Sequence, residues 1–125
     1  MAAVFRVIGV LVFVMMGAAL AAAHGDATPK RGGILQPIGE MDFELVVKTD
    51  KIDLYIYDHE EEMPTDTMSG VLKIIADGGS TKAELKPAGV NRLRAIEVTA
   101  TTGDRVIAIV TLPDGQLVSI EFAIP

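Results

Sequence analysis

Apolar and polar residues alternate with a period of two through most of the chain after residue 33. Apolar side chains stand at positions 41, 43, 45 and 47 and again at 52, 54 and 56, with mostly polar or aromatic residues between them. A period of two places successive side chains on opposite faces of an extended strand. The pattern therefore predicts β-strands that bury one face, and no helical periodicity appears beyond residue 33.

Turn-forming residues interrupt this alternation at regular intervals. They are Thr49-Asp50, Asp77-Gly78-Gly79, Thr102-Gly103-Asp104 and Pro113-Asp114-Gly115. Short connections rich in Asp and Gly join antiparallel strands. They delimit seven strands, or eight if residues 34–38 form one. We expect an all-β fold over residues 34–125, an antiparallel immunoglobulin-like β-sandwich, with a small barrel as the alternative.

The first 23 residues have a different composition. Arg6 is their only charge, a long apolar run follows, and the segment ends in Ala21-Ala22-Ala23. This is the pattern of a signal peptide cut after Ala23, or alternatively after Ala21. A retained membrane anchor is the competing interpretation, but no basic cluster follows the apolar run. We expect residues 1–23 to be a cleaved signal peptide, residues 24–33 a flexible arm, and the mature protein periplasmic with no membrane span.

Charge and cysteine content exclude several functions. The 125 residues include 11 Lys+Arg and 17 Asp+Glu, a formal charge of −6, and no cysteine. An acidic chain without a basic stripe disfavours nucleic acid as a partner. The lack of cysteine excludes disulfides, thiolate zinc sites, iron–sulfur clusters and cysteine nucleophiles.

The stretch Asp58–Ser69 is the one long segment without a strand pattern. It contains His59, the glutamates of positions 60–62, Met63 and Met68. Its charge density and a proline predict an exposed loop at one end of the fold. Such a loop either carries function or is simply a solvated acidic segment.

A cut after Ala23 would make His24 the first residue of the mature chain. Its α-amine and imidazole would then offer two nitrogen ligands, both deprotonated at modest cost near neutral pH. Nitrogen ligands in a tetragonal arrangement suit copper(II). We predict a metal site formed by His24 and His59, the only histidines, with Asp26 and Met63 as lesser ligands. The competing interpretation is that His24 stands beside the cleavage site by chance.

Catalytic motifs are absent from the sequence. The serines lack a Gly-x-Ser-x-Gly context, and there is neither a His-Glu-x-x-His pattern nor a phosphate-binding loop. We expect no enzymatic activity; an oxidase with copper on an N-terminal histidine is the one enzymatic alternative.

Several segments of the chain carry a resemblance to a known family. They are His24-Gly25-Asp26, Lys30-Arg31-Gly32-Gly33, and the stretches at residues 42–46, 52–59, 84–93 and 110–113. In these segments the chain resembles small exported proteins found with bacterial heavy-metal resistance systems. It is also similar to the β-rich N-terminal region of periplasmic adaptor subunits of cation-efflux pumps. The resemblance implies a periplasmic accessory protein that handles copper or, less favoured, zinc or cobalt.

Two functions thus follow as expectations. The first is an exported accessory protein of heavy-metal handling that binds a transition-metal ion such as copper. The alternative is a metal-independent interaction module that docks on an efflux-pump adaptor or another envelope protein. It would use a sheet edge or the face that carries Tyr55 and Tyr57, although these tyrosines more simply form a second buried face.

Overall fold

The computed structural model describes residues 28–125. All regular structure in this part of the chain is β-strand, so the all-β antiparallel class predicted from the alternation is confirmed. The strands are β1 (Ile34–Ile38), β2 (Met41–Val47), β3 (Lys51–Asp58), β4 (Glu61–Glu62), β5 (Ser69–Ala76), β6 (Gly79–Pro87), β7 (Arg92–Ile96), β8 (Arg105–Thr111) and β9 (Leu117–Ala123).

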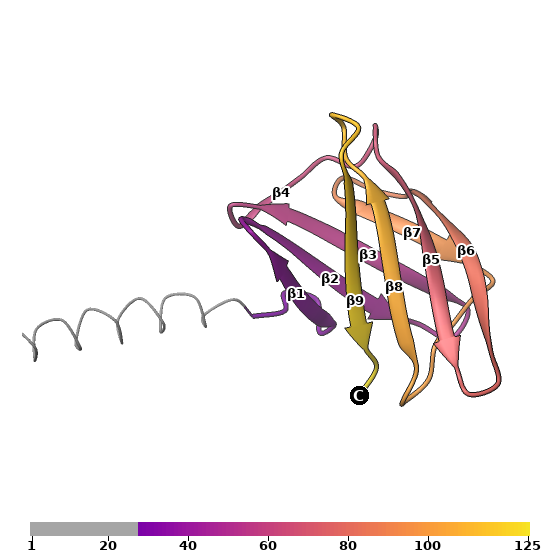
Figure 1. Cartoon of the computed structure of the whole chain (residues 1–125). Coiled ribbons are helices and arrows are strands. Elements are labelled where there is room, and N and C mark those ends of the chain that lie inside the picture. The colour runs from indigo at the N-terminus through magenta and orange to yellow at the C-terminus, as the bar shows by residue number, and fades with distance from the viewer. Residues whose placement is uncertain (1–27) are drawn as a thin grey trace, which may run out of the picture.

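The strands form one antiparallel sheet that curves into a nearly closed, barrel-like shape (Figure 1). Their order is β1-β2-β3-β7-β6-β5-β8-β9, and β4 pairs with β3 off this path. Because β6 pairs with β5 over most of its length and with β7 only at its end, it is the strand at which the sheet turns. The two outer strands, β1 and β9, approach each other and leave a narrow seam.

The register of β2 and β3 shows how the alternation produces the core. Phe43 lies opposite Ile56, and Leu45 lies opposite Leu54, so four of the predicted apolar positions share one face. Side chains from β5, β8 and β9 meet them inside the barrel. The largest fully buried apolar side chains are Phe43, Phe122, Leu45, Ile52, Leu54, Ile56, Leu72, Leu85, Leu93, Ile120 and Val106.

Two expectations about the strands need correction. Residues 28–125 form nine strands rather than seven or eight, because Glu61 and Glu62 form the short β4 inside the segment predicted to be an irregular loop. That segment is also less exposed than expected, since Thr65 and Met68 are buried. Thr65 donates its hydroxyl proton to the Arg92 carbonyl at 3.0 Å, which holds the segment against the sheet.

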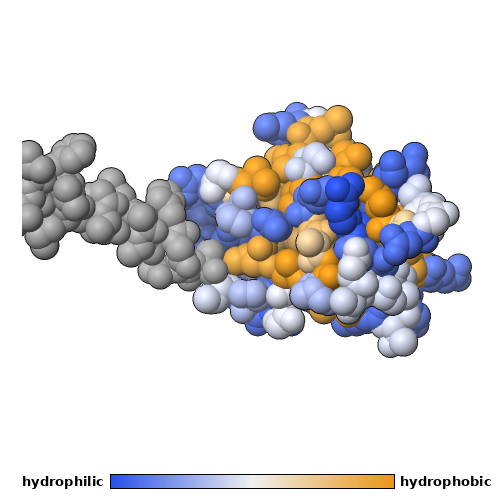
Figure 2. Space-filling model, turned by 60° about the horizontal axis from the view of Figure 1, so that its bottom comes forward, coloured by the Kyte–Doolittle hydropathy of each residue, from blue (hydrophilic) through white to orange (hydrophobic). Residues whose placement is uncertain are grey.

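Apolar side chains reach the surface at the end of the molecule shown in Figure 2. A shallow pocket of about 260 Å³ opens there between β1 and β9. It is lined by Gly32, Gly33, Ile34, Leu45, Val47, Ile124 and Pro125. The seam of the barrel is therefore bordered by apolar rather than charged groups.

Candidate functional site

His59 lies at the tip of a tight turn that joins β3 to β4. Asp58 pairs with Glu61, so the turn consists of His59 and Glu60 alone. Both adopt positive φ angles, 51° and 68°, which is the conformation of a type I′ turn. Residues with side chains pay a steric cost in this conformation, and asparagine and glycine normally occupy such turns. Two adjacent non-glycine residues in this conformation make the tip a candidate for function.

This backbone cost leads to a stability prediction. Glu60→Gly should raise the unfolding free energy by about 0.5–1 kcal/mol, because glycine adopts positive φ without a clash. Thermal denaturation should show a rise in Tm of roughly 4 °C. Glu61→Gly is the matched control, since it puts glycine inside a strand and should lower Tm. A lower Tm for both variants would contradict the turn conformation.

The imidazole of His59 lies between two carboxylates. Its Nδ1 is 2.8 Å from Asp58 Oδ1, and its Nε2 is 3.7 Å from Glu40 Oε2. A carboxylate only accepts hydrogen bonds, so Nδ1 donates to Asp58, and Nε2 is the ring nitrogen that faces Glu40. Metal-binding histidines are commonly oriented by such a carboxylate behind the ring. The side chains of His59 and Glu40 are 69% and 76% exposed, and both can therefore be reached from solvent.

Glu40 was not among the residues predicted from the sequence. It occupies the β1–β2 turn, and its carbonyl accepts the backbone N–H of His59 at 3.0 Å. The two turns meet because Met41 pairs with Asp58 across β2 and β3. Once that register is assigned, Glu40, which precedes Met41, is expected to lie beside His59, which follows Asp58. The strand register is therefore the signal that could have identified Glu40.

The other predicted ligands lie in different places. Met63 is half-buried and packs against the hydrophobic core. His24 and Asp26 lie outside the described residues. Among residues 28–125, no group of three or more His, Asp or Glu side chains has an arrangement that could hold a metal ion. His59 and Glu40 thus provide two donors, and a complete site needs ligands from elsewhere.

The end of the predicted arm is attached to this same turn. The Lys30 ammonium donates to the Glu60 carbonyl at 3.0 Å, and the Arg31 guanidinium donates to the Glu62 carboxylate at 3.2 Å. These cations also lie over the two tyrosines of β3, Lys30 4.5 Å from the ring centre of Tyr57 and Arg31 4.2 Å from that of Tyr55. The prediction that the tyrosines form a second buried face is confirmed, since Tyr57 is 3% exposed and Tyr55 is 7% exposed.

A buried carboxylate on β2 holds the backbone of this segment. Glu44 accepts the N–H groups of Lys30, Arg31 and Gly33 at distances of 2.8–2.9 Å. Its side chain is fully buried, so these charge-assisted hydrogen bonds replace its hydration. The backbone of Gly33 passes so close to β2 that a Cβ there would overlap the Leu45 carbonyl oxygen. The hydrogen bonds to Glu44 and the close backbone approach at Gly33 together hold residues 30–33 against the sheet.

A second buried carboxylate, Asp53, lies on the same outer face of β3. Arg94 donates to both of its oxygens, at 2.7 and 3.0 Å, and the Lys48 ammonium lies 3.3 Å away. Burial by itself raises the pKa of Asp53, but the hydrogen bonds from Arg94 and Lys48 outweigh it and hold that pKa below its ordinary value. Arg92 and Arg94 lie beside the buried groups of β3 because β7 pairs with that strand. Asn91 is buried, and its side-chain amide donates to the Ile56 carbonyl.

Comparisons with known proteins found no match, whether to protein-family models, curated proteins or solved structures. In the part of the chain that the structure describes, no helix is long and apolar enough to cross a membrane.

Proposed function

We propose that this protein is an exported, periplasmic accessory protein of heavy-metal handling that binds a transition-metal ion, with copper favoured over zinc and cobalt. The observation that carries the proposal is the pairing of His59 Nε2 with Glu40 Oε2 at 3.7 Å on an exposed, costly turn. Two ligands about 2.1 Å from one ion lie roughly 3.0–3.4 Å apart. A small rotation of these exposed side chains would bring both atoms to that separation.

The remaining donors would come from the N-terminal arm. His24 precedes Lys30 by six positions, and Lys30 is bonded to the turn that carries His59. Six extended residues span up to about 20 Å, which is ample reach to the turn. The α-amine and imidazole of His24, His59 Nε2 and a Glu40 oxygen would supply three nitrogens and one oxygen. That donor set suits tetragonal copper(II). Asp26 is a further oxygen donor, and Met63 a soft ligand for copper(I).

The proposal is tested by copper(II) titration of the secreted, processed protein after its N-terminus has been verified by intact mass. Electron paramagnetic resonance should show a tetragonal signal with nitrogen coupling. His24→Ala and His59→Asn should each change the spectrum and weaken binding at least about tenfold, since each removes a direct ligand. Asparagine retains the positive-φ turn.

Glu40→Gln should weaken copper binding less than either histidine substitution, because the amide oxygen remains a weak donor. Glu121→Gln, on the exposed face of β9, is the control and should leave binding unchanged. A spectrum and affinity that are indifferent to both histidine substitutions would refute the proposed site, and so would a mature chain that begins at Gly25.

The alternative proposal is a metal-independent interaction module of the cell envelope, with an efflux-pump adaptor as one partner. It is supported by the open strand edges of the barrel. The Tyr55/Tyr57 face is less suited to docking, because Lys30 and Arg31 cover it. Capture of an adaptor from envelope extract, unaffected by chelator and by His59→Asn, would favour it. We propose no catalytic role for either function.

The immunoglobulin-like sandwich also remains a proposal. What supports it is the division of the strands at β6, with β1, β2, β3 and β7 on one side and β5, β8 and β9 on the other. The two groups would correspond to the two layers of a sandwich.

A further inference from the structure

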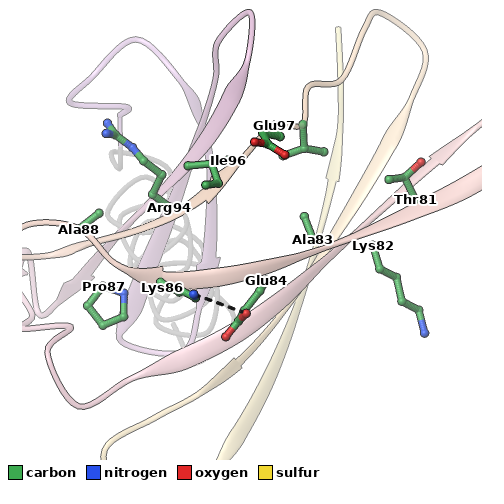
Figure 3. Close-up of a pocket in the computed structure, with 11 residues that line it drawn as sticks. Thr81, Lys82, Ala83, Glu84, Lys86, Pro87, Ala88, Arg94, Ile96 and Glu97 are labelled. Carbon is green, nitrogen blue, oxygen red and sulfur yellow. Dashed lines mark ion pairs between the residues drawn. The ribbon is translucent and has the colours of Figure 1, made fainter.

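A groove of about 490 Å³ opens where β6 and β7 separate. β6 pairs with β7 only at Lys86 and Pro87, whereas it pairs with β5 from Gly79 to Leu85. Figure 3 shows the two strands diverging, with Ile96 and Glu97 on one wall and Thr81 and Ala83 on the other. Within the part of the chain that the structure describes, one edge of β6 therefore has no strand beside it along most of its length.

The pairing pattern identifies the residues whose backbone faces this open edge. In an antiparallel ladder, the N–H and C=O groups of successive residues point to opposite neighbours. Ala88 donates its N–H to the Arg92 carbonyl, so the even-numbered residues of β6 face the β7 side. The two-residue turn at Asp77-Gly78 agrees, because it closes on the pair Ala76 and Gly79 and directs the odd-numbered residues toward β5. Among the described residues, the backbone groups of Lys82 and Glu84 that face the groove thus have no strand partner.

The charged side chains along this edge can pair with those of a second, antiparallel copy of the same strand. Residues 80–86 contain neither proline nor glycine, and Lys82 and Glu84 are exposed on either side of Ala83. If a second copy of β6 lies antiparallel and the two-fold axis passes through Ala83, Lys82 of each copy lies opposite Glu84 of the other. Shifting the register by two residues would instead place Lys82 opposite Lys82, or Glu84 opposite Glu84. Like charges directly opposite each other destabilise a sheet.

We propose that this groove is a dimerisation surface, in which β6 of a second copy pairs antiparallel with β6 in the register centred on Ala83. Proteins usually protect an open edge with prolines, bulges or charged side chains, especially lysine. Here the charges alternate in sign, which selects one register instead of repelling every partner. Ile96, 67% exposed, gives the groove an apolar wall that the second copy would cover. A contact of this length is at the small end of specific interfaces, so we expect a dissociation constant in the micromolar range.

Sedimentation velocity of the mature protein over a wide concentration range, with chelator present to exclude metal, tests the proposal. The wild type should shift from monomer to dimer with concentration. Glu84→Lys and Lys82→Glu should each weaken the dimer at least about tenfold, because two-fold symmetry makes two like-charge pairs from every single reversal. The double variant Lys82→Glu/Glu84→Lys should restore dimerisation, since it exchanges the charges and keeps their complementarity.

Glu121→Lys is the control, because it reverses a comparably exposed charge on β9. It should dimerise as the wild type does. Circular dichroism should show that every variant is folded, as expected for exposed positions. A wild type that remains monomeric at about 1 mM would overturn the proposal. A double variant that stays as weak as the single ones would overturn the register.

Discussion

Asp53→Ala is expected to lower the free energy of unfolding by about 3 kcal/mol, the lower end of the cost of breaking a buried ion pair. The carboxylate is fully buried, and its removal leaves the Arg94 guanidinium without its partner in a partly enclosed position. Lys48 and Arg92 lose the same counter-charge. Urea or thermal denaturation measures the effect, which corresponds to a fall in Tm of roughly 12–20 °C for a domain of this size.

The exposed Asp66 provides the control, and Asp66→Ala should change stability by less than about 0.5 kcal/mol. Acid denaturation gives a second readout. Because the pKa of Asp53 is lowered in the folded state, its stabilisation is present above its ordinary pKa, about 3.9, and is lost as the pH falls through the folded pKa. In Asp53→Asn, the free energy of unfolding should therefore fall less steeply as the pH drops below 4. An acid denaturation curve that is unchanged in Asp53→Asn would contradict the buried network. Equal losses of stability in Asp53→Ala and Asp66→Ala would also contradict it.

Glu44→Ala is the second change with a large expected effect. It should lower the free energy of unfolding by about 2–3 kcal/mol. It removes the acceptor of three backbone N–H groups at once. Hydrogen bonds to a charged group contribute more than neutral ones, but amides released at the N-terminal end regain water, which limits the cost. Hydrogen exchange should reveal the specific consequence: the amides of residues 30, 31 and 33 lose protection while those of β5 and β8 keep theirs.

Glu44→Gln separates charge from shape in this prediction. The amide oxygen can still accept two of the three hydrogen bonds, so we expect about half of the loss seen with alanine. Preserved protection of residues 30, 31 and 33 in Glu44→Ala would show that the cations stacked on Tyr55 and Tyr57 hold the segment by themselves. If the metal site is as proposed, Glu44→Ala should also weaken copper binding, because the arm would no longer start beside His59.

Part of the candidate site is accessible from the sequence. His59 was found because histidine is scarce in this chain, and tyrosines on the face opposite an apolar stripe predicted a second buried surface. Glu40 escaped attention because it looks like an ordinary turn residue. Its proximity to His59 depends on the register of β2 against β3, which places two turns from separate hairpins side by side.

The buried carboxylates show the same limit more strongly. Glu44 and Asp53 occupy the polar positions of alternating strands, which predicts solvent exposure. Both are fully buried, and no buried side-chain polar atom in residues 28–125 lacks a hydrogen-bond partner. Their partners come from residues 30–33 and from β7, segments that only the folded chain brings to this face.

The antiparallel strands, most of their turns and the face of each strand that enters the core were predictable from the amino acids, because side-chain alternation and turn chemistry are local properties. The folded chain was needed to show that the sheet nearly closes, that residues 30–33 cover the outer face of β3, and that β6 keeps an open edge. These features depend on pairings between distant segments, in which a buried charge is tolerated only where the fold supplies its partner.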